Sequence, residues 1–105
     1  MKFLAVTACP SGVAHTYMSA EALANASKKR GIEIKVETQG SIGIENEITM
    51  EDVKDADAVI LTKDMAIKNK GRFKGKLVVN VSVGDAIKKA DQIIAKLEEH
   101  IKNNQ

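Results

Sequence analysis

Three short runs of consecutive apolar residues divide the chain. They lie within residues 3–8, 57–62 and 77–81, and each is bounded by charged or turn-forming residues. Continuous runs of this length are typical of strands that are buried on both faces of a parallel sheet. Residues 32–38 differ, because apolar and charged side chains alternate there. This alternation predicts a half-exposed strand at a sheet edge, with Glu33, Lys35 and Glu37 on its exposed face.

Between these strands the apolar residues recur at helical spacing. A helix is predicted over residues 13–30, and the basic run Lys28-Lys29-Arg30 followed by Gly31 favours its end there. Thr49 and Asp52 have the spacing of a capping box, which predicts a short helix ending near residue 56. Ser82 is expected to open a last helix. Its apolar stripe consists of Ile87, Ala90, Ile94, Leu97 and Ile101.

Strands that alternate with helices predict an α/β fold. We expect one domain over residues 1–105, with a Rossmann-like, four-stranded parallel sheet of order 2-1-3-4 and helices on both faces. The segment over residues 63–76, here called the connector, is basic and is expected to form one helical turn after Asp64. In this sheet order the winding reverses at the first strand, and such sheets bind ligands beyond the carboxyl ends of their strands at that switch point.

Composition narrows the class of protein. The 105 residues are 44% hydrophobic and 29% charged, as in an ordinary globular domain. A net charge of +2 gives no general reason to expect a nucleic-acid partner. The first apolar run is too short for a signal peptide, which favours a cytoplasmic protein. One cysteine excludes an internal disulfide, and two histidines argue against a structural metal site.

The candidate chemistry lies in residues 9–16, which read Cys-Pro-Ser-Gly-Val-Ala-His-Thr and leave the first strand at the predicted switch point. A loop that wraps around a helix start directs backbone N–H groups and the positive end of the helix dipole to one place. Such a site binds phosphate and stabilises a cysteine thiolate. The alternative is an inert buried Cys9, with Ser11 as a simple N-cap and His15 as a surface residue.

A small tyrosine phosphatase is the first competing function. That class uses Cys-x5-Arg-Ser/Thr after its first strand, together with an Asp-Pro general acid. Here the arginine position holds His15, so the planar bidentate clamp for phosphate is missing. The only proline is Pro10, so the chain has no Asp-Pro pair. A nucleophile without a hydrolytic acid is better suited to carry a phosphoryl group than to release it to water. A non-catalytic anion-binding module is the second alternative.

Four motifs resemble one family. Residues 7–18 read Thr-Ala-Cys-Pro-Ser-Gly-Val-Ala-His-Thr-Tyr-Met, and the match continues in residues 21–23, 35–41 and 72–76. Together they resemble the fructose-family IIB domain of the bacterial phosphoenolpyruvate-dependent sugar phosphotransferase system, over about residues 2–90. Ser11 stands where threonine is common in that family. Residues 65–67, Met-Ala-Ile, replace its frequent Asp-Ile-x-Val.

The resemblance implies a phosphotransferase in which Cys9 accepts a phosphoryl group from a phosphohistidine of a IIA protein or domain. Cys9 then transfers the group to a sugar, fructose or a related hexose, bound by the membrane-embedded IIC component. The expected phosphate-binding residues are Pro10, Ser11, Gly12, Val13, Ala14, His15 and Thr16. The expected pocket border consists of Gln39, Gly40, Ser41, Lys63 and Asp64. No metal, cofactor or nucleic acid is expected, and the place of action is the cytoplasm, at the membrane through IIC.

Charge is distributed unevenly around this region. The connector contains six basic residues and one acid, whereas residues 37–57 contain seven acids and one base. Such asymmetry would steer an acidic donor protein toward the site. The alternative is a solvated loop with ordinary surface charge.

Overall fold

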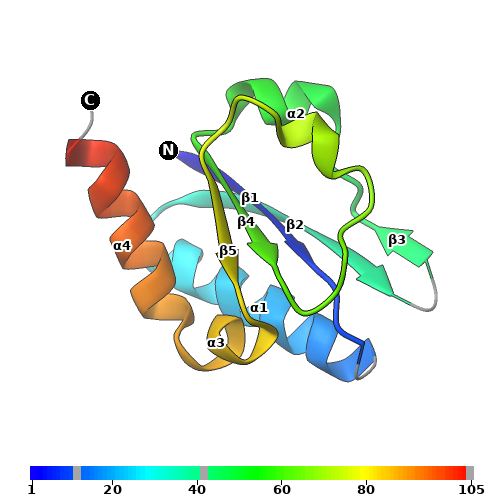
Figure 1. Cartoon of the computed structure of the whole chain (residues 1–105). Coiled ribbons are helices and arrows are strands. Elements are labelled where there is room, and N and C mark those ends of the chain that lie inside the picture. Colours follow the sequence, from blue (N-terminus) through cyan, green and yellow to red (C-terminus); the bar gives the residue numbers. More distant parts are fainter. Residues whose placement is uncertain (11–12, 41–42, 104–105) are drawn as a thin grey trace.

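The computed structural model describes residues 1–10, 13–40 and 43–103. Its sheet has five strands in the order β3-β2-β1-β4-β5 (Figure 1). The strands are β1 (Lys2–Thr7), β2 (Glu33–Gly40), β3 (Gly43–Glu45), β4 (Ala58–Thr62) and β5 (Val78–Val81). All neighbouring strands are parallel except β2 and β3, which are antiparallel. All carboxyl ends of the parallel strands therefore meet at one edge of the sheet.

Helices cover both faces of this sheet. They are α1 (Val13–Lys29), α2 (Met50–Asp55), the 3-10 helix η1 (Lys70–Phe73), α3 (Val83–Lys88) and α4 (Ala90–Asn103). Helices α1, α3 and α4 lie on one face, and α2 with the connector lies on the other (Figure 1). Alternate residues of β1 divide between the two cores, because Phe3 packs toward α1 and Leu4 packs toward α2. No helix among the described residues is long and apolar enough to cross a bilayer.

The predicted α/β class is confirmed, and the four predicted strands have the predicted order. The fifth strand, β3, was missed because its three residues are all exposed and carry no apolar alternation. It pairs with Thr38–Gly40, so β2 is a sheet edge only along its first half. The predicted edge position was therefore right for only part of β2.

Local capping signals were reliable. At the end of α1, the Ile32 and Gly31 amides donate to the carbonyls of Ser27 and Lys28, as in a Schellman motif. Gly31 has φ +69°, a conformation that glycine adopts without strain. The capping box between Thr49 and Asp52 is present at the start of α2. These sequence signals fixed the ends of two helices.

Two helical predictions were wrong. The helical turn expected after Asp64 lies instead at η1, six residues later. The single last helix is broken at Lys89, where φ −122° and ψ 25° leave the helical range. The break redirects the chain between α3 and α4 (Figure 1). Ile94 and Leu97 of α4 then belong to the core on the α1 face of the sheet. Ser82 does cap α3, because its hydroxyl accepts from the Asp85 amide at 3.0 Å.

The predicted exposure of Glu37 was also wrong. Its side chain is completely buried, although Glu33 on the same face of β2 is exposed. The reason is tertiary, because the connector folds over the carboxyl half of β2 and brings Arg72 against this carboxylate. The alternating pattern marked the face correctly, but it contained no information about what covers that face.

Candidate functional site

Cys9 follows the end of β1, between the carboxyl ends of β2 and β4. It is a half-buried free cysteine. The Thr62 hydroxyl accepts from the Ala8 amide at 3.0 Å and donates to the Ala8 carbonyl at 3.2 Å. The Thr7 hydroxyl donates to the Thr16 carbonyl at 3.1 Å, which ties β1 to the first turn of α1. These contacts fix both ends of the Cys9 loop at the switch point of the sheet.

Cys9 borders two hollows in the described surface. The first hollow has a volume of about 320 Å³ and lies between β2, β3 and the connector. Its lining consists of Ala8, Cys9, Pro10, Gln39, Gly40, Gly43, Ile44, Met65, Ala66 and Lys68. Ile44 and Met65 are exposed large apolar side chains. The first hollow therefore offers an apolar surface beside the thiol.

The second hollow, which Cys9 also borders, lies between the start of α1 and helix α3. Its volume is about 350 Å³. Its lining consists of Cys9, His15, Met18, Asp64, Val83, Gly84, Ile87 and Lys88. The Asp64 carboxylate accepts from the Val83 amide at 2.8 Å, so this acid also helps to cap α3. Lys88 and His15 bring nitrogen donors to the same hollow as the thiol.

The predicted phosphate-loop residues fall in different environments. Pro10 borders the first hollow, His15 borders the second, and Ala14 is exposed at the start of α1. Thr16 is buried. Ser11 and Gly12 lie outside the described residues, and so does the side chain of Val13, whose backbone begins α1.

The predicted pocket-border residues also separate. Gln39 and Gly40 share the first hollow with Cys9, and Asp64 shares the second. Lys63 borders a different hollow, which it shares with Thr62 and Asn80 but not with Cys9. Ser41 lies outside the described residues. Sequence reasoning missed the connector wall of the first hollow, formed by Met65, Ala66 and Lys68, because no sequence signal indicates where a loop without regular structure folds back.

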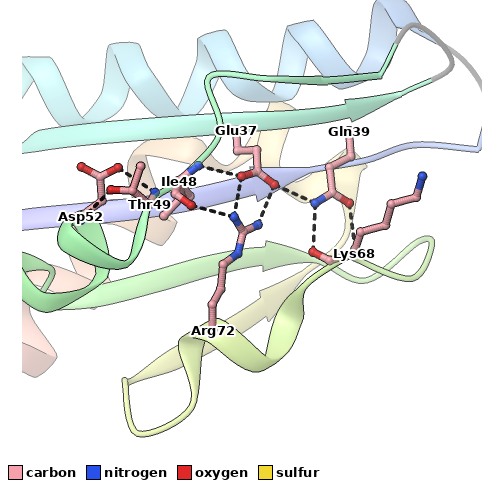
Figure 2. A network of polar contacts seen from close by, with 7 residues as sticks. All are labelled: Glu37, Gln39, Ile48, Thr49, Asp52, Lys68 and Arg72. Atoms are coloured by element: carbon pink, nitrogen blue, oxygen red, sulfur yellow. Dashed lines mark hydrogen bonds and ion pairs between the residues drawn. The ribbon is translucent and has the colours of Figure 1, made fainter.

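A buried ion pair fastens the connector to β2 (Figure 2). Arg72 donates to both carboxylate oxygens of Glu37, with Nη1–Oε1 at 2.8 Å and Nη2–Oε2 at 2.6 Å. The Ile48 amide also donates to Oε1 of Glu37 at 2.8 Å, and Arg72 Nη1 reaches the Ile48 carbonyl at 2.9 Å. The side chains are 0% exposed for Glu37 and 10% for Arg72. Three segments of the chain therefore meet at one carboxylate.

Electrostatics keep this carboxylate charged. Burial alone would raise the pKa of Glu37, but the hydrogen bonds from Arg72, Ile48 and Gln39 outweigh burial and lower that pKa below its ordinary value. Arg72 and Glu37 belong to the two oppositely charged segments noted in the sequence. Their charges cancel inside the protein, so the surface asymmetry is smaller than the count of residues indicated.

The chain resembles known proteins over most of its length. The family model "PTS system, Lactose/Cellobiose specific IIB subunit" matches residues 4–96. The chain is 64% identical over 100 residues to the "PTS system fructose-like EIIB component 2" of Escherichia coli K12, covering 95% of this chain and 94% of that protein. It is 47% identical over 95 residues to the "PTS system fructose-specific EIIABC component" of Bacillus subtilis, covering 90% of this chain but 15% of that protein.

Solved structures agree with these sequence matches. A domain of the fructose-specific IIABC component of Borrelia burgdorferi has a TM-score of 0.86 and 52% identity, with 91% of each chain covered. An enzyme IIB subunit from Escherichia coli K12 has a TM-score of 0.92 and 40% identity, covering 99% of this chain and 96% of that one. A Corynebacterium glutamicum arsenate reductase, with a TM-score of 0.53 and 14% identity, shares the fold alone.

These observations define an α/β protein with a cysteine loop at the switch point of a mainly parallel sheet. The chain belongs to the IIB family of the sugar phosphotransferase system and is a fructose-family IIB component. The resemblance seen in the sequence is confirmed at the level of the family. A role in phosphoryl transfer for sugar uptake follows from that membership in general terms.

Proposed function

We propose that Cys9 carries a phosphoryl group from a IIA phosphohistidine to a sugar bound by a IIC component. The observation that carries this proposal is the position of Cys9. A free, half-buried thiol stands at the switch point, ahead of the 17-residue helix α1 and open to two hollows. The names of the fused relatives, EIIABC and EIIBC, support IIA and IIC as partners. The place of action is the cytoplasmic face of the membrane.

The chemistry is a double displacement. In the first step the Cys9 thiolate attacks phosphorus, an S–P bond forms, and the N–P bond to the donor imidazole breaks. In the second step a sugar hydroxyl attacks the same phosphorus from the side opposite sulfur. An O–P bond then forms, the S–P bond breaks, the hydroxyl proton passes to solvent and the thiolate is restored. Backbone amides of residues 11–16 would hold the phosphoryl oxygens in both steps.

Individual roles follow from placement around the thiol. His15 borders the same hollow as Cys9, where it would donate a hydrogen bond to a phosphoryl oxygen. Ser11, Gly12 and Thr16 would complete the loop, with Pro10, Val13 and Ala14 shaping its backbone. Gly40 and Asp64 would border the bound group, and Ser41 would complete that border. Gln39 lines the first hollow beside it, whereas Lys63 borders a hollow that Cys9 does not share. Fructose or a related hexose is the proposed sugar, as in the fructose-specific relatives.

The first test is the mass of the intact protein after incubation with phosphoenolpyruvate, the general upstream transferases and a fructose-family IIA. We expect wild type to gain one phosphoryl group, because its thiolate is the acceptor. The variants Cys9→Ser and Cys9→Ala should gain none. His15→Ala should still gain the group, but about tenfold more slowly, because it loses one charge-assisted hydrogen bond to the phosphoryl group.

The alternatives have distinct outcomes in the same assay. A wild type that stays unmodified beside a competent IIA would exclude the carrier role for that donor. Hydrolysis of p-nitrophenyl phosphate that depends on Cys9 would then indicate a phosphatase. Phosphate binding that is equal in wild type and Cys9→Ala, without any turnover, would indicate an anion-binding module.

A further inference from the structure

The first hollow has one wall that belongs to no helix or strand. Residues 65–68 run across it before η1 begins, and Met65, Ala66 and Lys68 face the same hollow as Cys9. Lys68 is tied to the sheet by hydrogen bonds to its main chain. Any partner group that reaches Cys9 through the first hollow passes this wall. What fixes the wall therefore bears on phosphoryl transfer.

The Gln39 side chain holds the wall by forming the two main-chain hydrogen bonds that a neighbouring strand would form (Figure 2). Its Nε2 donates to the Lys68 carbonyl at 3.1 Å, and its Oε1 accepts from the Lys68 amide at 2.9 Å. Both main-chain polar groups of Lys68 are satisfied by one amide. Gln39 is only 5% exposed, so water competes poorly for these bonds.

Glu37 determines which way this amide faces. Nε2 of Gln39 also donates to Oε2 of Glu37 at 2.7 Å. A carboxylate only accepts hydrogen bonds, so the Gln39 amide must turn its NH₂ group toward Glu37 and its oxygen toward the Lys68 amide. Arg72 keeps the carboxylate ionised through its two hydrogen bonds. Glu37 and the Lys68 amide therefore favour the same orientation of the Gln39 side chain, and Arg72 holds Glu37 in place behind it.

We propose that Gln39 is a positioning residue, which, with Glu37 and Arg72 behind it, holds residues 65–68 as the wall of the first hollow so that a phosphoryl partner can bind beside Cys9. This inference rests on the proposed function. Gln39 touches the main chain of the wall, and its effect on the partner passes through Met65 and Lys68. A loosened wall would weaken partner binding more than it slows the chemical step.

The test is Gln39→Met, which keeps the length and volume of the side chain but removes its hydrogen bonds. Hydrogen exchange of the Lys68 amide, followed by NMR, should accelerate about tenfold or more, because the variant loses one or two hydrogen bonds that protect this amide. In single-turnover transfer from phosphorylated IIA, the half-saturating IIA concentration should rise about tenfold, with the maximal rate within about twofold of wild type. Alkylation of Cys9 by iodoacetamide should stay unchanged, because the thiol loop is intact.

Arg30→Gln is the matched control. It breaks the Arg30–Glu98 ion pair of 2.6 Å between the end of α1 and α4, at the opposite end of the sheet. Neither hydrogen exchange of the Lys68 amide nor phosphoryl transfer should change in this variant.

Three outcomes would contradict parts of the proposal. If exchange of the Lys68 amide is unchanged in Gln39→Met, the Gln39 side chain does not hold the wall. If exchange accelerates but the half-saturating IIA concentration stays the same, the wall does not position the partner, and the carrier function stands. If wild type accepts no phosphoryl group, the proposed function fails, and the inference about transfer fails with it.

Discussion

At the scale of single residues, the ion pair between Glu37 and Arg72 differs from an ordinary surface ion pair, because its side chains are only 0% and 10% exposed. Desolvating two charges costs several kcal/mol, and only good geometry with further hydrogen bonds offsets that cost. Here the pair is bidentate, and the Ile48 amide and the Gln39 amide satisfy the remaining acceptor positions of Glu37. Arg72 also lies over the Phe73 ring, with its guanidinium carbon 4.7 Å from the ring centroid. The pair therefore joins the connector to β2 with a defined geometry.

Removing one member of this pair should be costly. Glu37→Gln leaves the Arg72 charge buried without its counter-ion, so we expect the free energy of unfolding to fall by about 3–5 kcal/mol. Urea unfolding at pH 7 measures it. Asp91→Asn is the control, because it breaks an ion pair with Lys29 whose two side chains are both 71% exposed, and it should change stability by less than about 0.5 kcal/mol. Equal effects of the two variants would contradict the structural role of Glu37.

The same pair predicts how stability depends on pH. The pKa of Glu37 is lower in the folded protein than its ordinary value of 4.5. Below that value the unfolded chain takes up a proton that the folded chain resists, so the stability that Glu37 supplies is present above pH 4.5 and is lost on further acidification. The stability gap between wild type and Glu37→Gln should therefore narrow from pH 7 toward pH 3. A gap that stays constant would show that Glu37 does not titrate with a lowered pKa.

At the residue scale, the predicted strand order and helix start place Gln39 and His15 at the same sheet edge as Cys9. In the structure each of the two shares a separate hollow with Cys9. The partner of Glu37 could not be predicted from the sequence. Arg72 is 35 positions away in a connector without periodicity, and its pairing depends on how that loop folds back. Residue type, spacing and strand order predict which side chains reach the sheet edge, but contacts made by an irregular loop are tertiary information.

At the scale of elements, the β2–β3 hairpin is attached to α1 by a hydrogen bond from the Tyr17 hydroxyl to the Glu45 carboxylate. This contact lies beside the strand end that supplies Gly40, Gly43 and Ile44 to the first hollow. The Glu45 carboxylate raises the pKa of Tyr17 above its ordinary value of 10.0, because an acceptor with negative charge favours the protonated phenol. The hairpin and the helix therefore share a titratable link.

Tyr17 is the only tyrosine and the chain has no tryptophan, so absorbance at 295 nm reports this link directly. We expect wild type to titrate above pH 10 and Glu45→Gln to titrate at lower pH, because the neutral amide no longer disfavours the phenolate. Glu47→Gln, which removes a neighbouring exposed carboxylate, should resemble wild type. A Tyr17 midpoint that is the same in wild type and Glu45→Gln would mean that the hairpin is not held to α1 in solution.

Most helices and strands were predictable from the sequence, and each wrong prediction has a physical cause. Continuous apolar runs predicted the central strands, and local capping chemistry at Thr49, Ser82 and Gly31 predicted helix ends. The strand β3 was not predictable, since it is held by main-chain pairing with β2 and has no apolar pattern. The break at Lys89 was missed because the apolar stripe continues through it at helical spacing.

At the scale of the whole molecule, contacts within the protein reduce the number of basic groups that the connector presents to a partner. Arg72 is neutralised by Glu37, and the Lys76 ammonium donates to the Ala56 carbonyl at 3.0 Å. The exposed basic residues that remain on the connector include Lys68, which borders the first hollow, and Lys70 in the turn that follows it. The basic field that faces an approaching partner therefore comes from fewer basic residues than the connector contains, and one of them, Lys68, shares the first hollow with Cys9.

This arrangement makes the last prediction one of association rate and salt. Neutralising Lys68 and Lys70 together (Lys68→Gln with Lys70→Gln) should slow association with an acidic phosphorylated IIA by about tenfold at low salt, because steering by a local positive field raises on-rates. The loss should disappear near 0.5 M salt, where screening extends over only a few ångströms. Lys28→Gln with Lys96→Gln removes the same net charge from exposed positions on α1 and α4 and should have little effect. Stopped-flow measurement of phosphoryl transfer under second-order conditions separates the two double variants. An equal loss in both would mean that net charge, and not the field beside Cys9, governs the encounter.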